Sequence, residues 1–383
     1  MKIAAITNSR IPSLTANSIQ AMKVTQALAQ LGHEVRIFAP RETKSASPES
    51  LAERYGLQVS PRITWLPSLR VLKRLDFALL AHIAARLFKA DLVYTWLPQS
   101  AVAAAQSGLP VVLEMHADVA GRMGPWWVER FWGASERRLM TVTTRALKDA
   151  LERSVGFHFP PEAIMVAPNG IELESYAGLP EPAEARRRLH LPPLPTAGFT
   201  GHIYPGRGAH LLFDLARQMT GVHFLWVGGT PELVEFWRGK LSDAGIMNVT
   251  MTGFLEHRLI PLYQAAAEVL LMPYSRSVEA SSGQDIAEVI NPMKMFEYMA
   301  AGRAIVSADL PSIREVLNEQ NAVLCEPGDL AAWRFAIEGL LADGPRRRAL
   351  GERARRDVQK LTWTAREERI LDVIANVQRQ VKS

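Results

Sequence analysis

The feature that most constrains the fold is an alternation of short apolar runs with longer amphipathic segments along almost the whole chain. In the first half the expected strands lie at 2–7, 34–39, 62–66, 92–96, 110–116, 140–144 and 163–167. Their continuous apolar character is typical of strands that are buried on both faces. The pattern therefore predicts a parallel sheet covered by helices, one of which is expected at 18–32 and ends on Gly32.

The same pattern starts again after a proline-rich stretch at 178–195, which we interpret as a linker because proline interrupts both helices and strands. The second set of expected strands lies at 197–201, 222–228, 249–253, 269–273, 304–308 and 321–325. A chain of 383 residues also exceeds what one ordinary core accommodates. We predict an α/β protein with two doubly wound, Rossmann-like domains, 1–178 and 179–363, which face a central cleft.

Bulk properties narrow the class of protein. The single cysteine, Cys325, excludes an internal disulfide and favours a reducing, cytoplasmic compartment. The N-terminus resembles no secretory signal, and no uncharged apolar stretch reaches membrane-spanning length. The net charge of +5 is compatible with an anionic partner such as a phosphate-bearing substrate, a membrane surface or nucleic acid, and equally with an ordinary solvated surface.

The segment 199–216 is the first candidate site. A strand leads into a glycine-containing turn and then into a helix that opens near Gly208, with His202 at the strand exit and Arg207 at the helix start. Helix N-termini carry unpaired N–H groups and attract anions. A glycine turn that merely joins a strand to a helix is the structural alternative.

The segment "NPMKMFEYMAAG" (291–302) is the second candidate. Asn291 is expected as N-cap, Pro292 as first helical residue and Gly302 as the residue that ends the helix. Lys294, Glu297 and Tyr298 share one face of an otherwise apolar helix. An exposed ion pair would be worth less than about 1 kcal/mol, so we favour a face that looks into a ligand-binding cleft.

Two further segments carry weaker signals. The polar loop at 275–290 includes Ser282, Gly283, Gln284 and Asp285 and follows an expected strand, so it either holds substrate hydroxyls or simply connects two elements. The basic, amphipathic segment 70–89 fits contact with a membrane surface.

Taken together, these segments resemble retaining glycosyltransferases of the GT-B fold, in particular family 4, over nearly the whole chain. "GHIYPGRGAHLL" (201–212) resembles the family's phosphate loop, and "FEYMAAGRAIVSADLPSIREV" (296–316) resembles its donor-binding helix and the strand after it. The remaining matches are "VAPNGIE" (166–172), "SLTANSIQAMKVTQALAQLGHEV" (13–35) and "VVLEMHAD" (111–118).

The resemblance implies roles for single residues. Glu297 would accept hydrogen bonds from the donor ribose, and His116 would face the reacting sugar. The donor diphosphate would be held by Arg207, Lys294, His202, the backbone of Met293 and Asn17. The C-terminal helix, 364–383, is expected to return to the first domain.

Three positions depart from the family pattern. Val289 stands where a first glutamate is expected, with Glu288 one place away, and His202 replaces an arginine. Arg207 stands for the family lysine and keeps its charge.

The resemblance implies a retaining transfer of a sugar from a nucleotide-diphosphate sugar to a glycan, lipid-linked or small-molecule acceptor. The chain contains no D-x-D sequence, so no metal and no other cofactor is expected, and nucleic acid is not an expected partner. The enzyme is expected in the cytoplasm or at the inner face of the membrane. A nucleotide-sugar epimerase of the same fold and a binding protein with a decayed site are the alternatives.

Overall fold

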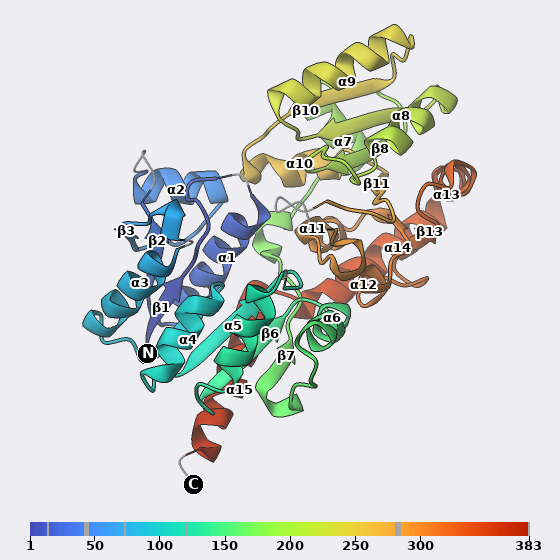
Figure 1. Cartoon of the computed structure of the whole chain (residues 1–383). Helices are drawn as coiled ribbons and strands as arrows, with labels where there is room; N and C mark the ends of the chain where they lie inside the picture. Colours follow the sequence, from blue (N-terminus) through green and yellow to red (C-terminus); the bar gives the residue numbers. More distant parts are fainter. Residues whose placement is uncertain (14, 42–45, 73, 120, 280–284, 382–383) are drawn as a thin grey trace. The chain divides into compact units, whose positions relative to one another are not determined.

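The computed structural model divides the chain into two units, each built around its own sheet (Figure 1). It describes residues 1–13, 15–41, 46–72, 74–119, 121–279 and 285–381. The first unit comprises residues 1–170 and 363–383, and the second comprises 171–362. The expected C-terminal helix is present and belongs to the first unit.

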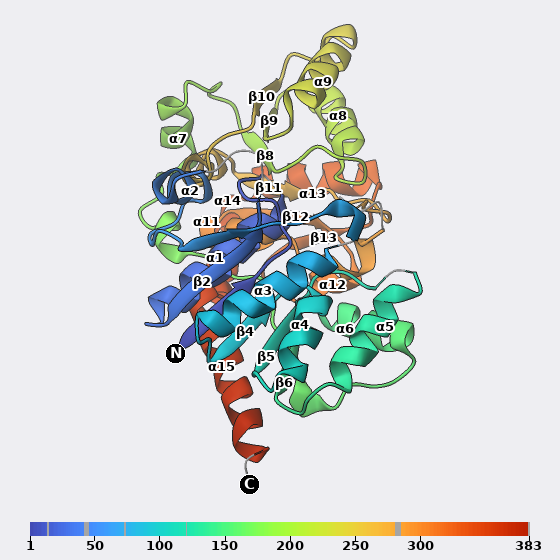
Figure 2. The same cartoon turned by 60° about the vertical axis from the view of Figure 1, so that its left-hand side comes forward.

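The first unit contains a seven-stranded parallel sheet in the order β3-β2-β1-β4-β5-β6-β7. Its strands are β1 (Lys2–Ile6), β2 (Glu34–Pro40), β3 (Ile63–Leu66), β4 (Leu92–Thr95), β5 (Val111–Met115), β6 (Arg138–Val142) and β7 (Ile164–Val166). Its helices are α1 (Ala16–Gln30), α2 (Pro48–Tyr55), α3 (Leu75–Leu87), α4 (Pro98–Gln106), α5 (Met123–Trp132), α6 (Arg145–Val155) and α15 (Trp363–Gln380), with short 3₁₀ turns η1 (Arg70–Leu72) and η2 (Pro161–Ala163). Helix α1 packs beside α15, and α3 packs beside α4 (Figure 2).

The second unit repeats this plan with six parallel strands in the order β10-β9-β8-β11-β12-β13. The strands are β8 (Thr196–Thr200), β9 (His223–Val227), β10 (Val249–Gly253), β11 (Val269–Met272), β12 (Ala304–Ala308) and β13 (Val323–Cys325). The helices are α7 (Pro182–Arg188), α8 (Ala209–Gln218), α9 (Pro231–Asp243), α10 (Ile260–Ala265), α11 (Met293–Ala301), α12 (Pro311–Arg314), α13 (Leu330–Ala342) and α14 (Gly344–Asp357). The 3₁₀ turns are η3 (Leu173–Tyr176), η4 (His257–Leu259), η5 (Ala287–Val289) and η6 (Val358–Lys360).

Each sheet has a topological switch point, where the order of its strands reverses. In both units this point lies next to the first strand of the sheet. In the first unit this point lies between β1 and β4, and in the second between β8 and β11. Open parallel sheets bind ligands outside the carboxyl ends of the strands at such points. The predicted doubly wound architecture is confirmed, and it directs attention to the segments that follow β1, β8 and β11.

The proline-rich stretch at 178–195 is not a linker, as the sequence suggested, but part of the second unit. It contains α7, where Ala185 is buried and Arg186 forms a buried ion pair of 2.8 Å with Glu268. The division between the units falls after Gly170, where the backbone N–H of Ile171 donates to the carbonyl of Leu361. Proline here begins a helix at its first turn, a position that needs no N–H donor.

Local signals in the sequence account for several helix ends. Thr144, Thr230, Asp329 and Asp343 each accept a hydrogen bond from a backbone N–H in the first turn of α6, α9, α13 and α14, respectively. Among the described residues no helix has both the length and the apolar character needed to cross a bilayer.

Candidate functional site

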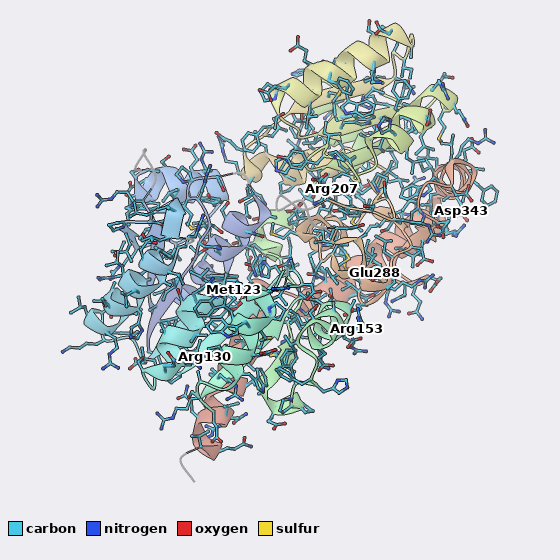
Figure 3. All side chains as sticks on the ribbon, in the orientation of Figure 1. Met123, Arg130, Arg153, Arg207, Glu288 and Asp343 are labelled. Atoms are coloured by element: carbon cyan, nitrogen blue, oxygen red, sulfur yellow. The ribbon has the colours of Figure 1, made fainter. Side chains whose placement is uncertain are left out.

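The candidate site residues fall into two groups, one in each unit, and the larger group surrounds the N-terminal turn of α11. Lys294 and Glu297 lie on this helix, and Arg207 lies on the loop between β8 and α8 (Figure 3). Tyr274 follows β11, and Phe199 lies within β8. The loops after two neighbouring strands thus bring residues from distant parts of the chain to one edge of the sheet.

The ammonium group of Lys294 is enclosed by aromatic rings. Its Nζ lies 4.0 Å from the ring centroid of Phe199 and 5.4 Å from that of Tyr274. Gly201 closes the third side at a φ of +129°, and a Cβ there would lie 2.7 Å from Nζ. Only glycine lets the backbone approach the ammonium so closely. Lys294 is therefore held in a cage rather than extended into solvent.

Arg207 shares an aromatic neighbour with Lys294. Its guanidinium carbon lies 5.3 Å from the ring centroid of Tyr274, and the Lys294 ammonium lies 5.4 Å from the same centroid. Burial and, to a lesser extent, the positive charge of Arg207 lower the pKa of Lys294 to about 7, although Glu297 acts in the opposite direction. Two cations held against one ring repel each other, so the arrangement would gain stability from an anion.

The turn that presents Arg207 depends on glycines at positive φ. Gly206 and Gly208 have φ values of +78° and +89°, and Gly208 is the N-cap of α8. A Cβ at Gly208 would lie 2.0 Å from the carbonyl oxygen of Pro273, which follows β11. The two loops at this sheet edge are therefore packed backbone against backbone. The predicted helix start near Gly208 is confirmed.

Glu297 is held by two side chains that the sequence analysis did not single out. His257 Nε2 lies 3.4 Å from Oε1, and the Gln264 amide donates to Oε2 over 3.1 Å and to the Thr200 hydroxyl over 3.1 Å. Burial on its own would raise the pKa of Glu297, but His257, Gln264 and Lys294 outweigh it and lower the pKa. The carboxylate, which is 14% exposed, is therefore oriented and ionised.

Two expectations for this helix need correction, and the alternative of an exposed ion pair can be excluded. Pro292, not Asn291, is the N-cap, because Pro292 is extended (φ −76°, ψ 130°) and α11 begins at Met293. Tyr298 does not face a ligand: it is buried, and its hydroxyl accepts a 2.8 Å hydrogen bond from the Thr200 N–H. The exposed ion-pair reading of Lys294 and Glu297 is wrong, since both are largely covered. The expected end of the helix at Gly302, at a φ of +65°, is confirmed.

The remaining residues that the sequence singled out in the second unit are His202, Met293, Val289 and Glu288. His202 stacks on Tyr204 with ring centroids 4.8 Å apart. Met293 occupies the first position of α11. Val289 is buried, so the residue that replaces the family glutamate packs inward, whereas the neighbouring Glu288 is exposed (Figure 3).

Within the polar loop, Ser282, Gly283 and Gln284 lie outside the described residues. Asp285 is described, and its Oδ1 accepts hydrogen bonds from the N–H groups of Val278 (2.9 Å) and Ala287 (3.0 Å). These backbone donors lower its pKa. Asp285 thus shapes the loop through Oδ1, and a contact of this loop with substrate hydroxyls stays a prediction.

The group in the first unit contains His116, directly after β5. Its Nε2 lies 2.7 Å from Oε1 of Glu114, a residue of β5 that is almost fully buried. Burial on its own would raise the pKa of Glu114, but Arg366 and His116 outweigh it and lower the pKa to about 2. The ionised carboxylate accepts a hydrogen bond from Nε2–H of His116, so Nδ1 is the ring nitrogen that this contact leaves available.

Glu114 is the centre of a buried network. Arg366 of α15 donates to Glu114 from Nη2 over 2.6 Å, and Gln20 and the Tyr94 hydroxyl also donate to it. Arg366 also pairs with Glu367, whose pKa burial raises to about 7. The sequence could have indicated a role for Glu114, because a charged residue is unusual inside the apolar run "VVLEMH". No local sequence pattern indicates a role for Arg366.

The last predicted residue, Asn17, lies exposed in the first turn of α1. Among the described residues, no three His, Cys, Asp or Glu side chains gather in a way that could hold a metal ion.

Comparisons with known proteins agree with this architecture. Residues 18–175 match the family model described as Glycosyltransferase Family 4, and residues 194–343 match Glycosyl transferases group 1. The chain therefore belongs to the family-4-like glycosyltransferases of the GT-B fold, and it is a glycosyltransferase.

Among individual relatives, the D-inositol 3-phosphate glycosyltransferase of Xylanimonas cellulosilytica is 27% identical, over 94% of this chain and 91% of its own length. The GDP-mannose-dependent alpha-mannosyltransferase of Mycolicibacterium smegmatis is 23% identical, over 95% and 94% of the two chains. The structure of HepE from Anabaena, solved with UDP, superimposes with a TM-score of 0.74 at 17% identity, over 98% of this chain and 100% of that chain.

Proposed function

We propose that this glycosyltransferase moves a sugar from a nucleotide-diphosphate sugar to an acceptor hydroxyl, with retention of the anomeric configuration and without a metal ion. The observation that carries the proposal is the pair of cations, Lys294 and Arg207, held against the ring of Tyr274 beside the N-terminus of α11. A diphosphate is an anion whose charge would relieve their repulsion. The same Anabaena protein has also been solved with UDP-glucose, which supports a donor of this class.

The diphosphate would contact both cations and the backbone of the first turn of α11. The N–H groups at Met293 and Lys294 are among the first in the helix, where backbone donors lack intrahelical partners. Arg207 can bind phosphate oxygens through two parallel hydrogen bonds, whereas the Lys294 ammonium acts as a point charge. His202 and Asn17 are proposed as further contacts, in keeping with the family resemblance.

Glu297 is proposed to bind the ribose of the donor. Its carboxylate has about four lone-pair sites, of which His257 and Gln264 engage two, so acceptor capacity remains for two hydroxyl donors. Because the carboxylate is ionised and oriented before the donor binds, little reorganisation is needed. Hydrogen bonds of hydroxyls to a charged acceptor are stronger than those to a neutral one.

In the proposed reaction the bond between the anomeric carbon and the diphosphate oxygen breaks while the acceptor oxygen bonds to the same face of the sugar. The acceptor proton passes to the departing phosphate oxygen. Arg207 and Lys294 stabilise the negative charge that grows on this leaving group, which is the role a metal ion would otherwise have. His116 is proposed to hold a sugar hydroxyl through Nδ1, with Glu114 keeping the ring in place.

The acceptor is proposed to be a glycan, a lipid-linked sugar or a small molecule with a free hydroxyl, and the enzyme is proposed to work in the cytoplasm or at the inner face of the membrane. The test begins with thermal shifts against nucleoside diphosphates and nucleotide sugars, followed by NMR of the transferred sugar. A raised melting temperature and an unchanged anomeric configuration are expected. Epimerised donor without acceptor would indicate an epimerase, and no shift with any nucleotide would indicate a decayed site.

A further inference from the structure

The carboxylate of Glu114 receives hydrogen bonds from four segments of the first unit. The donors come from α1, β4, the segment after β5, and α15: Gln20, Tyr94, His116 and Arg366. An ionised carboxylate has about four lone-pair sites, so these donors leave it no free direction. The direction in which Glu114 meets the His116 ring is therefore set by its three other partners.

Arg366 differs from the other donors because its guanidinium contacts both oxygens of Glu114. Nη2 lies 2.6 Å from Oε1, and Nη1 lies 3.3 Å from Oε2. Gln20 and His116 contact Oε1, and Tyr94 contacts Oε2. A guanidinium that meets both oxygens fixes the plane of a carboxylate, whereas a donor to one oxygen leaves the plane free to turn. Arg366 therefore decides the orientation of the oxygen that receives Nε2–H of His116.

The guanidinium of Arg366 is itself fixed by the backbone after β7. Its Nε donates to the carbonyl of Pro168 over 2.9 Å, and Nη2 donates to the carbonyl of Ala167 over 3.1 Å. Nη1 pairs with Glu367 at 2.5 Å. The Arg366 side chain is only 1% exposed, so water offers no replacement for these partners. The guanidinium therefore cannot turn away from Glu114 without breaking hydrogen bonds on its other side.

Stability alone does not account well for this network. It removes two carboxylates and a guanidinium from water, and apolar side chains of similar volume often stabilise a core as well as buried charges do. The network ends on a histidine directly after β5, and the His116 side chain is 21% exposed, whereas that of Glu114 is fully buried. Functional side chains need such supporting hydrogen bonds to stay in a productive geometry. The arrangement therefore fits a role in holding the His116 ring.

We propose that Arg366 is a positioning residue for sugar transfer: it orients the Glu114 carboxylate, which in turn holds the His116 ring toward the reacting sugar. This inference rests on the role proposed above for His116. Because the proposed diphosphate and ribose contacts lie in the second unit, substitution of Arg366 should lower kcat and leave the KM of the nucleotide sugar nearly unchanged. A displacement of a reacting contact by about 1 Å can cost roughly a hundredfold in rate.

The test combines turnover of UDP-glucose, with water as acceptor, and ¹⁵N NMR of the His116 ring, whose signals are assigned by their loss in His116→Ala. Arg366→Met should lower kcat roughly 10- to 100-fold. At about pH 8 the wild-type ring should show one state with Nε2 protonated, and Arg366→Met should show a mixture of Nε2–H and Nδ1–H states. Arg366→Lys should lose less in kcat, because an ammonium still attracts Glu114 but fixes only one oxygen.

A double variant separates action through Glu114 from independent effects. Glu114→Gln should also lower kcat roughly 10- to 100-fold. If Arg366 acts through Glu114, the double variant Glu114→Gln with Arg366→Met should be no slower than the slower of the two single variants, whereas independent losses would multiply. The double variant leaves neither partner of the pair buried alone, so it should fold even if Arg366→Met does not.

The matched control is Arg186→Met in the second unit. Arg186 is also buried, pairs with Glu268 at 2.8 Å and donates to the carbonyl of Ala266 over 2.9 Å. Its substitution should cost stability but leave the His116 spectrum and the kcat of the folded protein unchanged.

Two results would overturn the proposal alone: an unchanged His116 spectrum in Arg366→Met, or losses in kcat that multiply in the double variant. A low kcat in His116→Ala together with a wild-type kcat in folded Arg366→Met would do the same. A wild-type kcat in His116→Ala would instead refute the role proposed for His116, and the positioning role of Arg366 in sugar transfer would fall with it. The failure of the inference and the failure of the proposed function are thereby distinguished.

Discussion

The charge of Lys294 should make donor binding depend on pH in a way that few surface lysines could. Burial and the nearby Arg207 lower its pKa from 10.5 to about 7, so the ammonium is partly neutral under ordinary assay conditions. A bound diphosphate favours the charged form and raises this pKa again. Donor binding above pH 7 therefore takes up a proton, and the affinity should fall as the pH rises.

The size of the change in donor affinity follows from the titration of the Lys294 ammonium. If only the ammonium form of Lys294 binds the diphosphate, affinity follows the charged fraction, and that fraction falls roughly thirtyfold between pH 6 and pH 8.5 for a pKa of about 7. This corresponds to about 2 kcal/mol of binding free energy. An exposed lysine with an ordinary pKa would stay charged over the whole interval and would produce no change.

The assay is isothermal titration calorimetry with UDP-glucose or with whichever nucleotide sugar gives the largest thermal shift. A nucleotide sugar is used because the terminal phosphate of a free diphosphate itself titrates near pH 6. Lys294→Met should bind weakly with a flat pH profile. Arg207→Gln should bind weakly but keep a sloping profile, with its midpoint moved to higher pH because the repulsion is gone. A wild-type affinity that is constant within about twofold would refute the reasoning.

The ligand-free protein should show the opposite trend in stability. The folded-state pKa of Lys294 is lowered, so between about pH 7 and pH 10.5 the unfolded chain binds more protons than the folded chain. By linkage, the contribution of Lys294 to the free energy of unfolding rises with pH through this window. Lys294→Met should lack this contribution and should be the more stable protein at pH 7, which urea unfolding at several pH values can measure.

Four further outcomes are expected. Arg207→Ala should weaken nucleotide-sugar binding roughly 10- to 100-fold, since a charge-assisted hydrogen bond is worth about 1.5–3 kcal/mol; unchanged affinity in a folded variant would remove Arg207 from the site. Glu297→Gln should weaken binding of the ribonucleotide by about 1.5–3 kcal/mol and scarcely affect binding of its 2′,3′-dideoxy analogue. If the substitution weakens binding of both ligands equally, the coupling energy between Glu297 and the ribose hydroxyls is zero and Glu297 has a structural role. Sugar transfer should survive EDTA, because side-chain cations and a helix N-terminus serve the leaving group; loss of turnover that magnesium or manganese restores would contradict this. Glu114→Gln should lower the free energy of unfolding by about 3–5 kcal/mol, because it leaves the buried Arg366 without its main partner; a loss below about 1 kcal/mol in urea unfolding would show that the network carries little stability.

The sequence by itself determined the repeating strand–helix pattern and the parallel character of both sheets. Apolar runs such as 110–116 need no knowledge of their neighbours to indicate buried strands, and β5 forms there. Local signals were equally sufficient where a glycine must adopt a positive φ, as at Gly208 before α8 and Gly302 after α11. These features depend on interactions within a few residues, which is the range that a sequence pattern reports.

Sequence patterns were misleading where the packing of distant segments decided the outcome. The prolines at 178–195 indicated a linker, but Arg186 pairs with Glu268 and ties that stretch into the second unit. Tyr298 was placed on a ligand-facing side by helical spacing, but the N–H of Thr200 supplies a buried partner for its hydroxyl. Helical spacing gives the direction of a side chain, whereas the neighbouring strand decides whether that direction meets solvent or core.

Only the tertiary structure decided the chemical state of the site. The lowered pKa of Lys294 depends on Phe199, Gly201 and Tyr274, each of which lies on another segment of the chain. Likewise, Glu114 is separated by 252 residues from its partner Arg366. The sequence could name Lys294 as a cation, but a pKa is set by desolvation and by charges a few ångströms away, and these distances exist only once the loops after β8 and β11 have come together.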